Sequence, residues 1–576
     1  MKKKQILSIL MIVGLIVFVL LLILGIKLIQ ENTPSKEQQD LTEYYGMTNE
    51  SQVAITLNHT VLDTYGTIID GHVYLDYELV HDALNSRFYW DTNENILLYT
   101  TASKVISAKA DETRYYVGKS SNEYGRPIVK ASANSAWIDL EFVKEYTDFT
   151  YSFYESPSRL VITNDWKEVT VCNLKKNVEV RLDADIKSPI LSMAKKGSTL
   201  TILESDKKWT RVCTEDGVAG YVRSDKVKKT QNITLTSEYT PEAFHHIRSD
   251  KTINFLWHSV SGTHANSEIS TILSNTKGVN VISPSWFKLK NNKGYISSFA
   301  SSDYVEYCHS HGVQVWAMVK NTDLDSSDID TVQILSRTSS RQNLVNQLVS
   351  QALQYNLDGI HVDFRELDAT TIGDAYIQFL RELSIKCENN DIVLSTTVAV
   401  PEKDNGVYKY NEQSYFVDYI CLMAYDQHSG QNTGEGPVAS LDWVEKNIKA
   451  TLKEGISPEQ LLLGIPFHSK LWDLTPTSSE DDSDTDYLIG FKNYGLTAAK
   501  TWMDSNILEP TWLEDSAQYY GEIVKGGVTY KMWLEDASSI EKKLALIQEY
   551  KLAGSAFWNS DLDNESIWNT IIKYIN

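Results

Sequence analysis

Residues 357–366 read LDGIHVDFRE, an apolar run that ends in charged residues. The run predicts a short buried strand with polar groups at its carboxyl end. Because side chains alternate along a strand, His361, Asp363 and Arg365 share one face and the apolar residues between them share the other. Acidic and basic groups at the end of an apolar strand are typical of the catalytic rim of an α/β barrel.

Eight strand-like runs alternate with helical spacing in residues 250–576, and the quoted stretch is the fourth of them. This alternation is the βα pattern of a parallel sheet. Eight such runs predict a (β/α)8 TIM barrel, whose usual size is about 250 residues plus insertions. Residues 470–535 carry their own strands and aromatics, which predicts an α+β insertion after the seventh strand. The predicted strands are Ile253–Trp257, Gly278–Ser283, Val313–Val319, Leu357–Asp363, Ile392–Val398, Tyr419–Tyr425, Leu461–Pro466 and Gly554–Trp558.

Asp358, Gly359 and Asp363 match the pattern Asp-Gly-x-x-x-Asp-x-Glu. The stretch therefore resembles the signature strand of glycoside hydrolase family 18, as found in chitinase-like proteins and in bacterial cell-wall and spore-cortex members. Four more segments extend this resemblance over the whole domain 250–576, in the family's order. They are Ser283–Phe287, Met423–Asp426, Met532–Asp536 and Gly554–Trp558.

The resemblance implies the roles of several site residues. In this family the substrate's own acetamido oxygen attacks the anomeric carbon, and a glutamate protonates the leaving oxygen. Asp363 holds the place of the aspartate that orients the acetamido group, and Tyr425 matches the tyrosine that hydrogen-bonds its carbonyl. Trp558 matches the tryptophan that forms the floor of the sugar site, where an indole face suits a pyranose.

Three further residues are expected to bind substrate: Asp358, Trp286 and Asp426. Each assignment has a structural alternative, because Tyr425 and Trp558 are otherwise core aromatics and Trp286 is otherwise a loop residue that covers a helix. His361 is expected to be neutral, hydrogen-bonded to Asp363 and without a catalytic role.

Arg365 occupies the position of the family's catalytic glutamate. Its guanidinium stays protonated up to about pH 12, so it cannot act as a general acid. It is also a candidate ion-pair partner for Asp363. The nearest replacement acid is Glu366, which regular strand geometry points away from the barrel axis, so that a bulge or turn is needed for it to face the sugar. Two interpretations remain: an active glycosidase that uses Glu366, and a catalytically degenerate, lectin-like binding protein.

An apolar run from Ile6 to Ile26 follows three lysines and leads into polar residues without a cleavage site of small residues. A spanning helix needs about 20 residues, whereas a secretory apolar segment has about 7–15. We expect an uncleaved single-pass anchor in the cell membrane, with the lysines in the cytoplasm and residues after about 30 outside the cell. The alternative, a long signal peptide, also places the body outside.

A repeat with an offset of 63 residues lies between residues 51 and 165, where Val73–Val80 aligns with Ala136–Val143. Each half predicts a strand, a short helix and two strands, with Asp76 and Asp139 as N-caps. This repeat resembles the duplicated copper amine oxidase N-terminal-like domain, although no metal-ligand cluster accompanies it. Residues 166–230 form short alternating strands that resemble a bacterial SH3-like domain, and the resemblance implies binding to wall peptides.

Net charge and cysteine content bear on the partners and cofactors that the protein can have. The formal net charge of −22 argues against a nucleic-acid partner. The five cysteines show no zinc spacing, and no cofactor or metal is expected. Cys172 and Cys213 fall in one small domain, but the sequence does not decide whether they pair. It also does not indicate an oligomeric state.

The expected order of domains along the chain is 1–31 anchor, 32–50 linker, 51–165 duplicated domain, 166–230 SH3-like domain, 231–249 linker and 250–576 barrel.

We therefore expect a membrane-anchored extracellular protein that acts on or binds glycans containing N-acetylglucosamine. The SH3-like segment favours peptidoglycan over chitin.

Overall fold

The structure of the protein is a computed structural model. It describes residues 2–132, 135–430, 433–477, 487–507 and 509–574, so residues 478–486 and 508 of the predicted insertion lie outside the described residues. The chain forms two compact units. One comprises residues 1–90, 108–116 and 120–241, and the other comprises residues 91–107, 117–119 and 242–576.

The first unit begins with the helix α1 (Lys2–Asn32), which contains the predicted anchor. It is long and apolar enough to cross a membrane by length and composition, and its apolar window is not buried inside the protein. In water, a helix of this composition would expose its apolar side chains. A lipid or protein environment is needed to cover them.

The duplicated segment has the predicted order of elements. In the first half, β3 (His72–Asp76) leads into the short helix α3 (Tyr77–Leu79), and in the second half β10 (Ala136–Asp139) leads into α4 (Leu140–Glu145). Asp76 and Asp139 are the N-caps of these helices, since their carboxylates accept backbone N–H groups of the first turn. This prediction is confirmed.

These strands belong to a seven-stranded sheet, in which β1 and β12 run parallel. Its order is β11 (Thr150–Tyr154), β12 (Arg159–Thr163), β1 (Gln52–Leu57), β2 (Thr60–Ile69), β3, β10 and β9 (Val129–Ala131). The segment also contains β4 (Phe88–Asp91), β5 (Ile96–Thr100), β6 (Val105–Lys109), β7 (Arg114–Val117) and β8 (Ser120–Glu123).

A second sheet of the first unit packs around its own small core, which includes Cys172, Val180 and Val212. Its order is β15 (Ile190–Ala194), β14 (Val178–Arg181), β18 (Ala219–Arg223), β17 (Trp209–Thr214), β16 (Thr199–Ser205), β13 (Glu168–Asn173) and β19 (Thr230–Thr234). Cys172 and Cys213 are both buried here as free thiols, so they do not pair.

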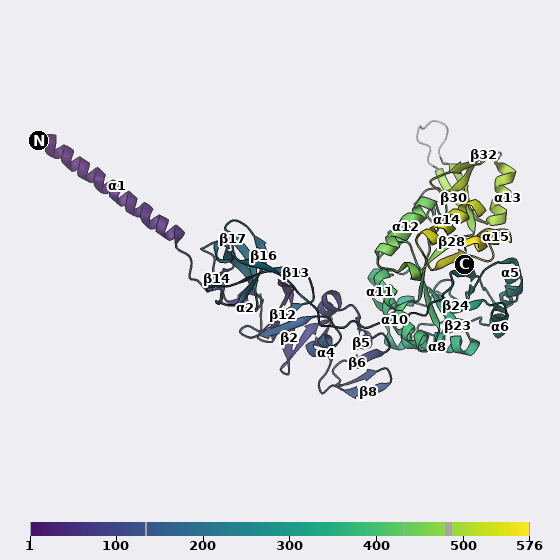
Figure 1. The fold of residues 1–576 in the computed structure, drawn as a ribbon, viewed down its shortest axis with the longest axis horizontal. Helices are drawn as coiled ribbons and strands as arrows, with labels where there is room; N and C mark the ends of the chain where they lie inside the picture. Colours follow the sequence, from purple (N-terminus) through teal and green to yellow (C-terminus); the bar gives the residue numbers. More distant parts are fainter. Residues whose placement is uncertain (1, 133–134, 431–432, 478–486, 508, 575–576) are drawn as a thin grey trace. The chain divides into compact units, whose positions relative to one another are not determined.

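The second unit is built on a closed barrel of eight parallel strands (Figure 1). Closure is shown by pairing between β21 and β24, which joins the ends of the strand row. All eight predicted strands are present, with ends that differ from the predictions by a few residues. They are β20 (Ile253–His258), β21 (Val281–Pro284), β24 (Gln314–Lys320), β25 (Gly359–Asp363), β26 (Val393–Val398), β27 (Tyr419–Leu422), β28 (Leu461–Pro466) and β34 (Gly554–Trp558).

Helices alternate with these strands, as the parallel order requires. They include α5 (Ile269–Asn275), α6 (Ser302–Ser310), α7 (Thr331–Ser336), α8 (Thr338–Tyr355), α10 (Ala375–Glu388), α11 (Tyr410–Phe416), α12 (Leu441–Lys453) and α14 (Ala537–Glu549). On β25 the predicted two faces are present. Phe364 stacks on Phe379 of α10, whereas His361 contacts Phe255 inside the barrel.

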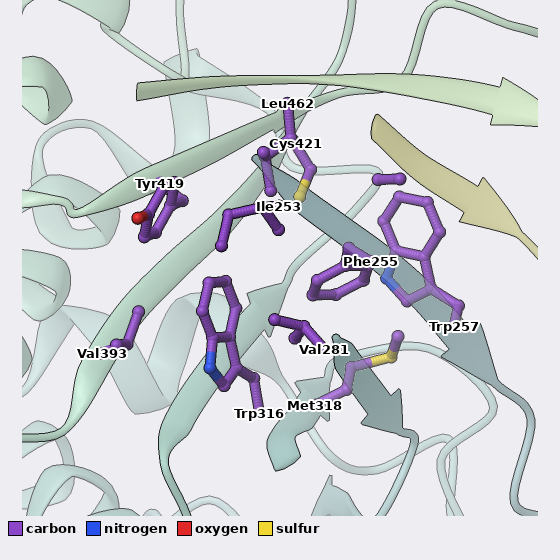
Figure 2. Close-up of a cluster of buried hydrophobic side chains, with 11 residues drawn as sticks. Ile253, Phe255, Trp257, Val281, Trp316, Met318, Val393, Tyr419, Cys421 and Leu462 are labelled. Carbon is purple, nitrogen blue, oxygen red and sulfur yellow. The ribbon is translucent and has the colours of Figure 1, made fainter. Parts of the chain in front are cut away.

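The barrel interior is filled by side chains, not open (Figure 2). Phe255, Trp257 and Trp316 meet there in edge-to-face contacts 5.0–5.8 Å apart between ring centres. Gly359 belongs to this packing, because a β-carbon at that position would lie 2.7 Å from the Trp316 ring. The glycine of the signature strand thus lets Trp316 fill the interior.

An antiparallel sheet follows β28, at the position predicted for the insertion. Its order is β30 (Tyr487–Gly495), β29 (His468–Pro476), β33 (Val528–Leu534), β32 (Gln518–Lys525) and β31 (Thr511–Leu513), and α13 (Leu496–Asn506) packs on β29 and β33. Lys470 of β29 contacts a residue of the site and is described below.

Candidate functional site

Two hollows open at the carboxyl ends of the barrel strands. The first, here the Tyr425 hollow, has a volume of about 380 Å³ and is lined by residues that follow β25, β26 and β27. The second, here the Trp558 hollow, has a volume of about 400 Å³ and is lined by the ends of β20, β24, β25 and β34. Among the described residues, Arg365 alone lines both. Each volume is in the range that holds a small ligand.

Asp363, the last residue of β25, forms an ion pair with Arg365. The Arg365 Nε donates to Asp363 Oδ1 at 2.8 Å, and the side chains are 29% and 4% exposed respectively. A nearly buried carboxylate needs such a partner, because burying an unpaired charge costs several kcal/mol. The sequence left two roles open for Asp363, and in this structure its carboxylate is engaged by Arg365.

The Arg365 guanidinium also lies over the indole of Trp558, with 4.9 Å from its carbon to the ring centre, which is a cation–π distance. The Arg365 backbone is fixed from the neighbouring strand. Its N–H donates to Asn321 Oδ1 at 2.9 Å, and its carbonyl accepts from Asn321 Nδ2 at 2.9 Å. Arg365 is therefore held by its backbone, its charge and its flat face.

The protonation states of Arg365 and Tyr425 follow from their surroundings. Burial alone would lower the pKa of Arg365, but the Asp363 carboxylate and the Tyr425 hydroxyl raise it above its ordinary value, so Arg365 stays a cation. Burial raises the pKa of Tyr425, and Asp363 and Asp426 add to this effect against the opposing charge of Arg365. Tyr425 therefore keeps its proton and can donate it in a hydrogen bond.

Glu366 follows Arg365 with a left-handed backbone, φ +55°, and its exposed side chain lines the Tyr425 hollow. The backbone therefore turns at Glu366, as required for this residue to leave regular strand geometry. The same hollow contains Asp404, whose pKa is raised by burial. A carboxyl group with a raised pKa in a cleft is a candidate proton donor.

Asp426 lines the Tyr425 hollow and accepts a hydrogen bond from Lys470 Nζ at 2.7 Å. Burial alone would raise the pKa of Asp426, but His468 and Lys470 hold it well below its usual range. Asp426 is consequently an ionised, lysine-paired acceptor at the hollow rather than an acid.

His361 has other partners than the sequence predicted. The Trp257 indole N–H donates to His361 Nε2 at 3.1 Å, and Thr397 Oγ1 lies 2.9 Å from the same nitrogen. An indole can only donate, so Nε2 accepts and the ring proton is on Nδ1, where it is donated to Ser395 Oγ at 2.9 Å. Burial lowers the pKa of His361 to about 4, which makes the ring neutral as expected.

Two predicted substrate-binding residues lie elsewhere. Asp358 precedes β25 at its amino end, opposite the hollows, where its Oδ2 accepts from the Val315 N–H and lies 2.8 Å from His309 Nε2. Trp286 is fully buried and donates its indole N–H to Asn266 at 2.8 Å. Neither residue lines a hollow, since strand direction puts Asp358 at the far end and packing encloses Trp286, and their role in substrate binding stays a prediction. Asp363, Tyr425, Asp426 and Trp558 do line the hollows.

Sequence reasoning missed several residues that shape the site, namely Asn321, Lys403, Asp404, Tyr408 and Lys470. Asn321 directly follows β24, so the rule that strand ends form the site would have found it. Lys403 and Asp404 follow β26, so the same rule would have found them. Lys470 comes from the insertion, and no spacing linked it to Asp426. Within the described ranges, no group of three or more His, Cys, Asp or Glu side chains could hold a metal ion.

Comparison with known proteins agrees with this geometry. The family model described as "Glycosyl hydrolases family 18" matches residues 115–563, which is more than half of the chain. The chain is similar to the "Uncharacterized glycosylase YvbX" of Bacillus subtilis, with 23% identity over 51% of this chain and 84% of that protein. It is also similar to the "Cortical fragment-lytic enzyme" of Bacillus anthracis, with 21% identity over 44% of this chain and 59% of that protein. The "Di-N-acetylchitobiase" of Homo sapiens is 25% identical over 46% of this chain and 72% of its own length.

Proposed function

The chain belongs to glycosyl hydrolases family 18, and from this premise we propose that its barrel binds glycans of N-acetylated amino sugars without hydrolysing them. The observation that carries the proposal is the Arg365–Asp363 ion pair at 2.8 Å, with the guanidinium over Trp558. Arg365 stays protonated and is too weak an acid to transfer a proton to a leaving oxygen. A general acid typically contributes about 10²–10⁴-fold to a rate, so its loss removes most of the turnover.

Arg365 also occupies the two groups that a sugar would use. It neutralises Asp363, the carboxylate expected to orient an acetamido group, and it covers the Trp558 face expected to receive a pyranose ring. Because Arg365 engages Asp363 and covers Trp558, we expect a glycan to bind in the hollows beside Arg365. Hydrolysis of a sugar stacked on Trp558 is disfavoured.

The ligand class follows from the family and from two relatives, whose names refer to cortical fragments and to di-N-acetylchitobiose. We favour peptidoglycan over chitin, because the sheet of residues 166–230 resembles an SH3-like wall-binding domain. The helix α1 supports a single-pass anchor that places the later residues outside the cell. The duplicated segment of residues 51–165 is proposed to be a copper amine oxidase N-terminal-like spacer.

A second function, hydrolysis, is favoured by one observation. The left-handed turn at Glu366 directs an exposed carboxyl group to the Tyr425 hollow, and Asp404 adds a carboxyl group with a raised pKa there. Either group would replace the missing acid if a sugar were seated with its leaving oxygen toward this hollow.

One experiment distinguishes the two functions. The full-length protein in detergent is titrated with chitooligosaccharides and peptidoglycan fragments by calorimetry, and the same mixtures are assayed for new reducing ends. Binding without new reducing ends supports the proposal. New reducing ends that vanish in Glu366→Gln or in Asp404→Asn would contradict it and identify the acid. Absence of binding to all of these ligands would refute both functions.

The proposed topology has its own test. Protease added to intact, wall-stripped cells should digest residues 32–576. Full protection of these residues would contradict an extracellular location.

A further inference from the structure

Arg365 forms a wall between the two hollows. It alone among the described residues lines both, and it is held in place at three points. Its backbone is bonded to Asn321 through both N–H and carbonyl, its Nε is bonded to Asp363, and its guanidinium lies on Trp558. A side chain fixed in this way is a defined partition.

An oligosaccharide that ran from one hollow to the other would have to displace this side chain. Displacement separates Arg365 from Asp363, whose side chain is only 4% exposed. Leaving a nearly buried carboxylate without its partner is unfavourable. The ion pair therefore opposes any ligand whose interior crosses the Trp558 face.

The wall also has unused hydrogen-bonding capacity. Arg365 Nη2 and the Tyr425 hydroxyl are both buried, and neither has a hydrogen-bond partner among the described residues. The residues that carry these two groups, Arg365 and Tyr425, line the Tyr425 hollow. A buried donor without a partner is unfavourable, so an acceptor oxygen that reached either group would be stabilised.

The end of a sugar chain supplies such an oxygen. A terminal sugar has a free hydroxyl where an internal sugar has a glycosidic bond, and a hydroxyl oxygen accepts hydrogen bonds. It can also approach a wall that a continuing chain cannot pass.

We propose that Arg365 makes this barrel a receptor for glycan ends, with the terminal sugar in the Tyr425 hollow against the Arg365 wall. This inference rests on the proposed glycan-binding function and adds a requirement on the ligand. Affinity should depend on the presence of an end and should stop rising once one hollow is filled.

The test measures how affinity depends on ligand length. N-acetylchitooligosaccharides of two to six sugars are titrated by calorimetry into the full-length wild type and Arg365→Ala. We expect the wild-type affinity to level off at the shorter oligosaccharides. In Arg365→Ala the two hollows join, and affinity should continue to rise to the hexamer by about tenfold, since additional sugar surface is buried.

Arg248→Ala is the matched control. Arg248 also pairs with a carboxylate, that of Glu459, its side chain is likewise 29% exposed, and it lines neither hollow. It should keep the wild-type length dependence. If Arg365→Ala does not fold, Asp363→Asn releases the wall without removing it and should shift the length dependence in the same direction.

The outcomes separate this inference from the proposed function. Wild-type affinity that rises through the hexamer as steeply as that of the variants would overturn the wall while leaving glycan binding intact. An unchanged plateau in both Arg365→Ala and Asp363→Asn would also overturn it. No binding by any of the proteins would refute glycan binding itself, and the wall with it.

Discussion

Two arginine–carboxylate pairs in the barrel unit show the difference between a structural ion pair and one that faces a ligand site. Arg341 of α8 pairs with Glu382 of α10 at 3.1 Å, and its other two nitrogens donate to the Leu335 carbonyl and the Thr338 hydroxyl. Its side chain is fully buried. Arg365 instead leaves Nη2 without a hydrogen-bond partner among the described residues and lies at the boundary of two hollows.

The two arginines differ in whether all of their nitrogens have hydrogen-bond partners. Every nitrogen of Arg341 has a partner and the side chain is fully buried, so this residue joins two helices and lines neither hollow. Arg365 is bonded to Asp363 and Asn321, but its buried Nη2 has no hydrogen-bond partner among the described residues. Natural proteins leave few buried donors unsatisfied, and such groups frequently mark functional sites.

The largest expected effect concerns stability. Arg341→Ala leaves Glu382 buried without its charge partner and should cost about 3–5 kcal/mol in the free energy of unfolding. Arg365→Ala should cost about 1–2 kcal/mol, because Arg365 is partly exposed and water can reach Asp363 once the wall is removed. Urea unfolding followed by tryptophan fluorescence measures both. Equal losses would show that the two pairs do not differ as described.

Acid should lower the free energy of unfolding through His361, which lies on β25 with Asp363. The pKa of His361 is about 4 in the folded protein and about 6.5 when unfolded, so between these values the unfolded chain binds the extra proton. Stability is therefore full above about pH 6.5 and falls as pH falls toward 4, by about 3 kcal/mol for this residue.

His361→Gln should remove this share of the pH dependence. Burial raises the pKa of Asp418 to about 7, which gives an opposite slope, but that contribution cancels when wild type and variant are compared. Urea unfolding at pH 7 and pH 4.5 measures the difference. Identical slopes for the two proteins would contradict the neutral, indole-bonded form of His361.

A smaller effect is expected on ligand affinity. Trp558→Ala removes the platform under Arg365 and one wall of the Trp558 hollow, and should weaken glycan binding by about 1–3 kcal/mol. Calorimetry with the same oligosaccharides measures it. Trp512→Ala is a suitable control, because Trp512 lies on β31 of the insertion and lines neither hollow. Equal affinities for all three proteins would make Trp558 a core residue.

The fold was largely predictable because its determinants are local. Each of the eight barrel strands is an apolar run that alternates with helical spacing, and the caps Asp76 and Asp139 follow from residue type at a strand–helix junction. The identity of the two earlier domains and their roles remain predictions.

The site was predicted only in part, for geometric reasons. Asp363 and Trp558 end parallel strands and Tyr425 lies three residues after another, so one rule placed all three at the carboxyl ends of the barrel strands, where the hollows open. Asp358 lies at the other end of β25 from the hollows, which was not predicted because a motif does not state which end of the strand each residue occupies. The Lys470–Asp426 pair joins residues 44 positions apart through the insertion, and nothing in the sequence indicated that contact.

The replacement of the acid by Arg365 is the most consequential feature of the site, and it was visible in sequence. What the sequence did not determine is where the arginine lies. Its contacts with Asp363, Trp558 and Asn321 are the basis of our proposal that it separates the two hollows.

The most direct test of this account is the hydrolysis rate of Arg365→Glu relative to wild type on one N-acetylated oligosaccharide. The substitution removes the wall and restores a carboxyl group two residues after Asp363, with Tyr425 still available to hold the acetamido oxygen. We predict no turnover in wild type and a gain of at least about tenfold over background in the variant, since a placed general acid is worth about 10²–10⁴-fold. A wild type that already hydrolyses the substrate, and gains nothing from Arg365→Glu, would contradict the account.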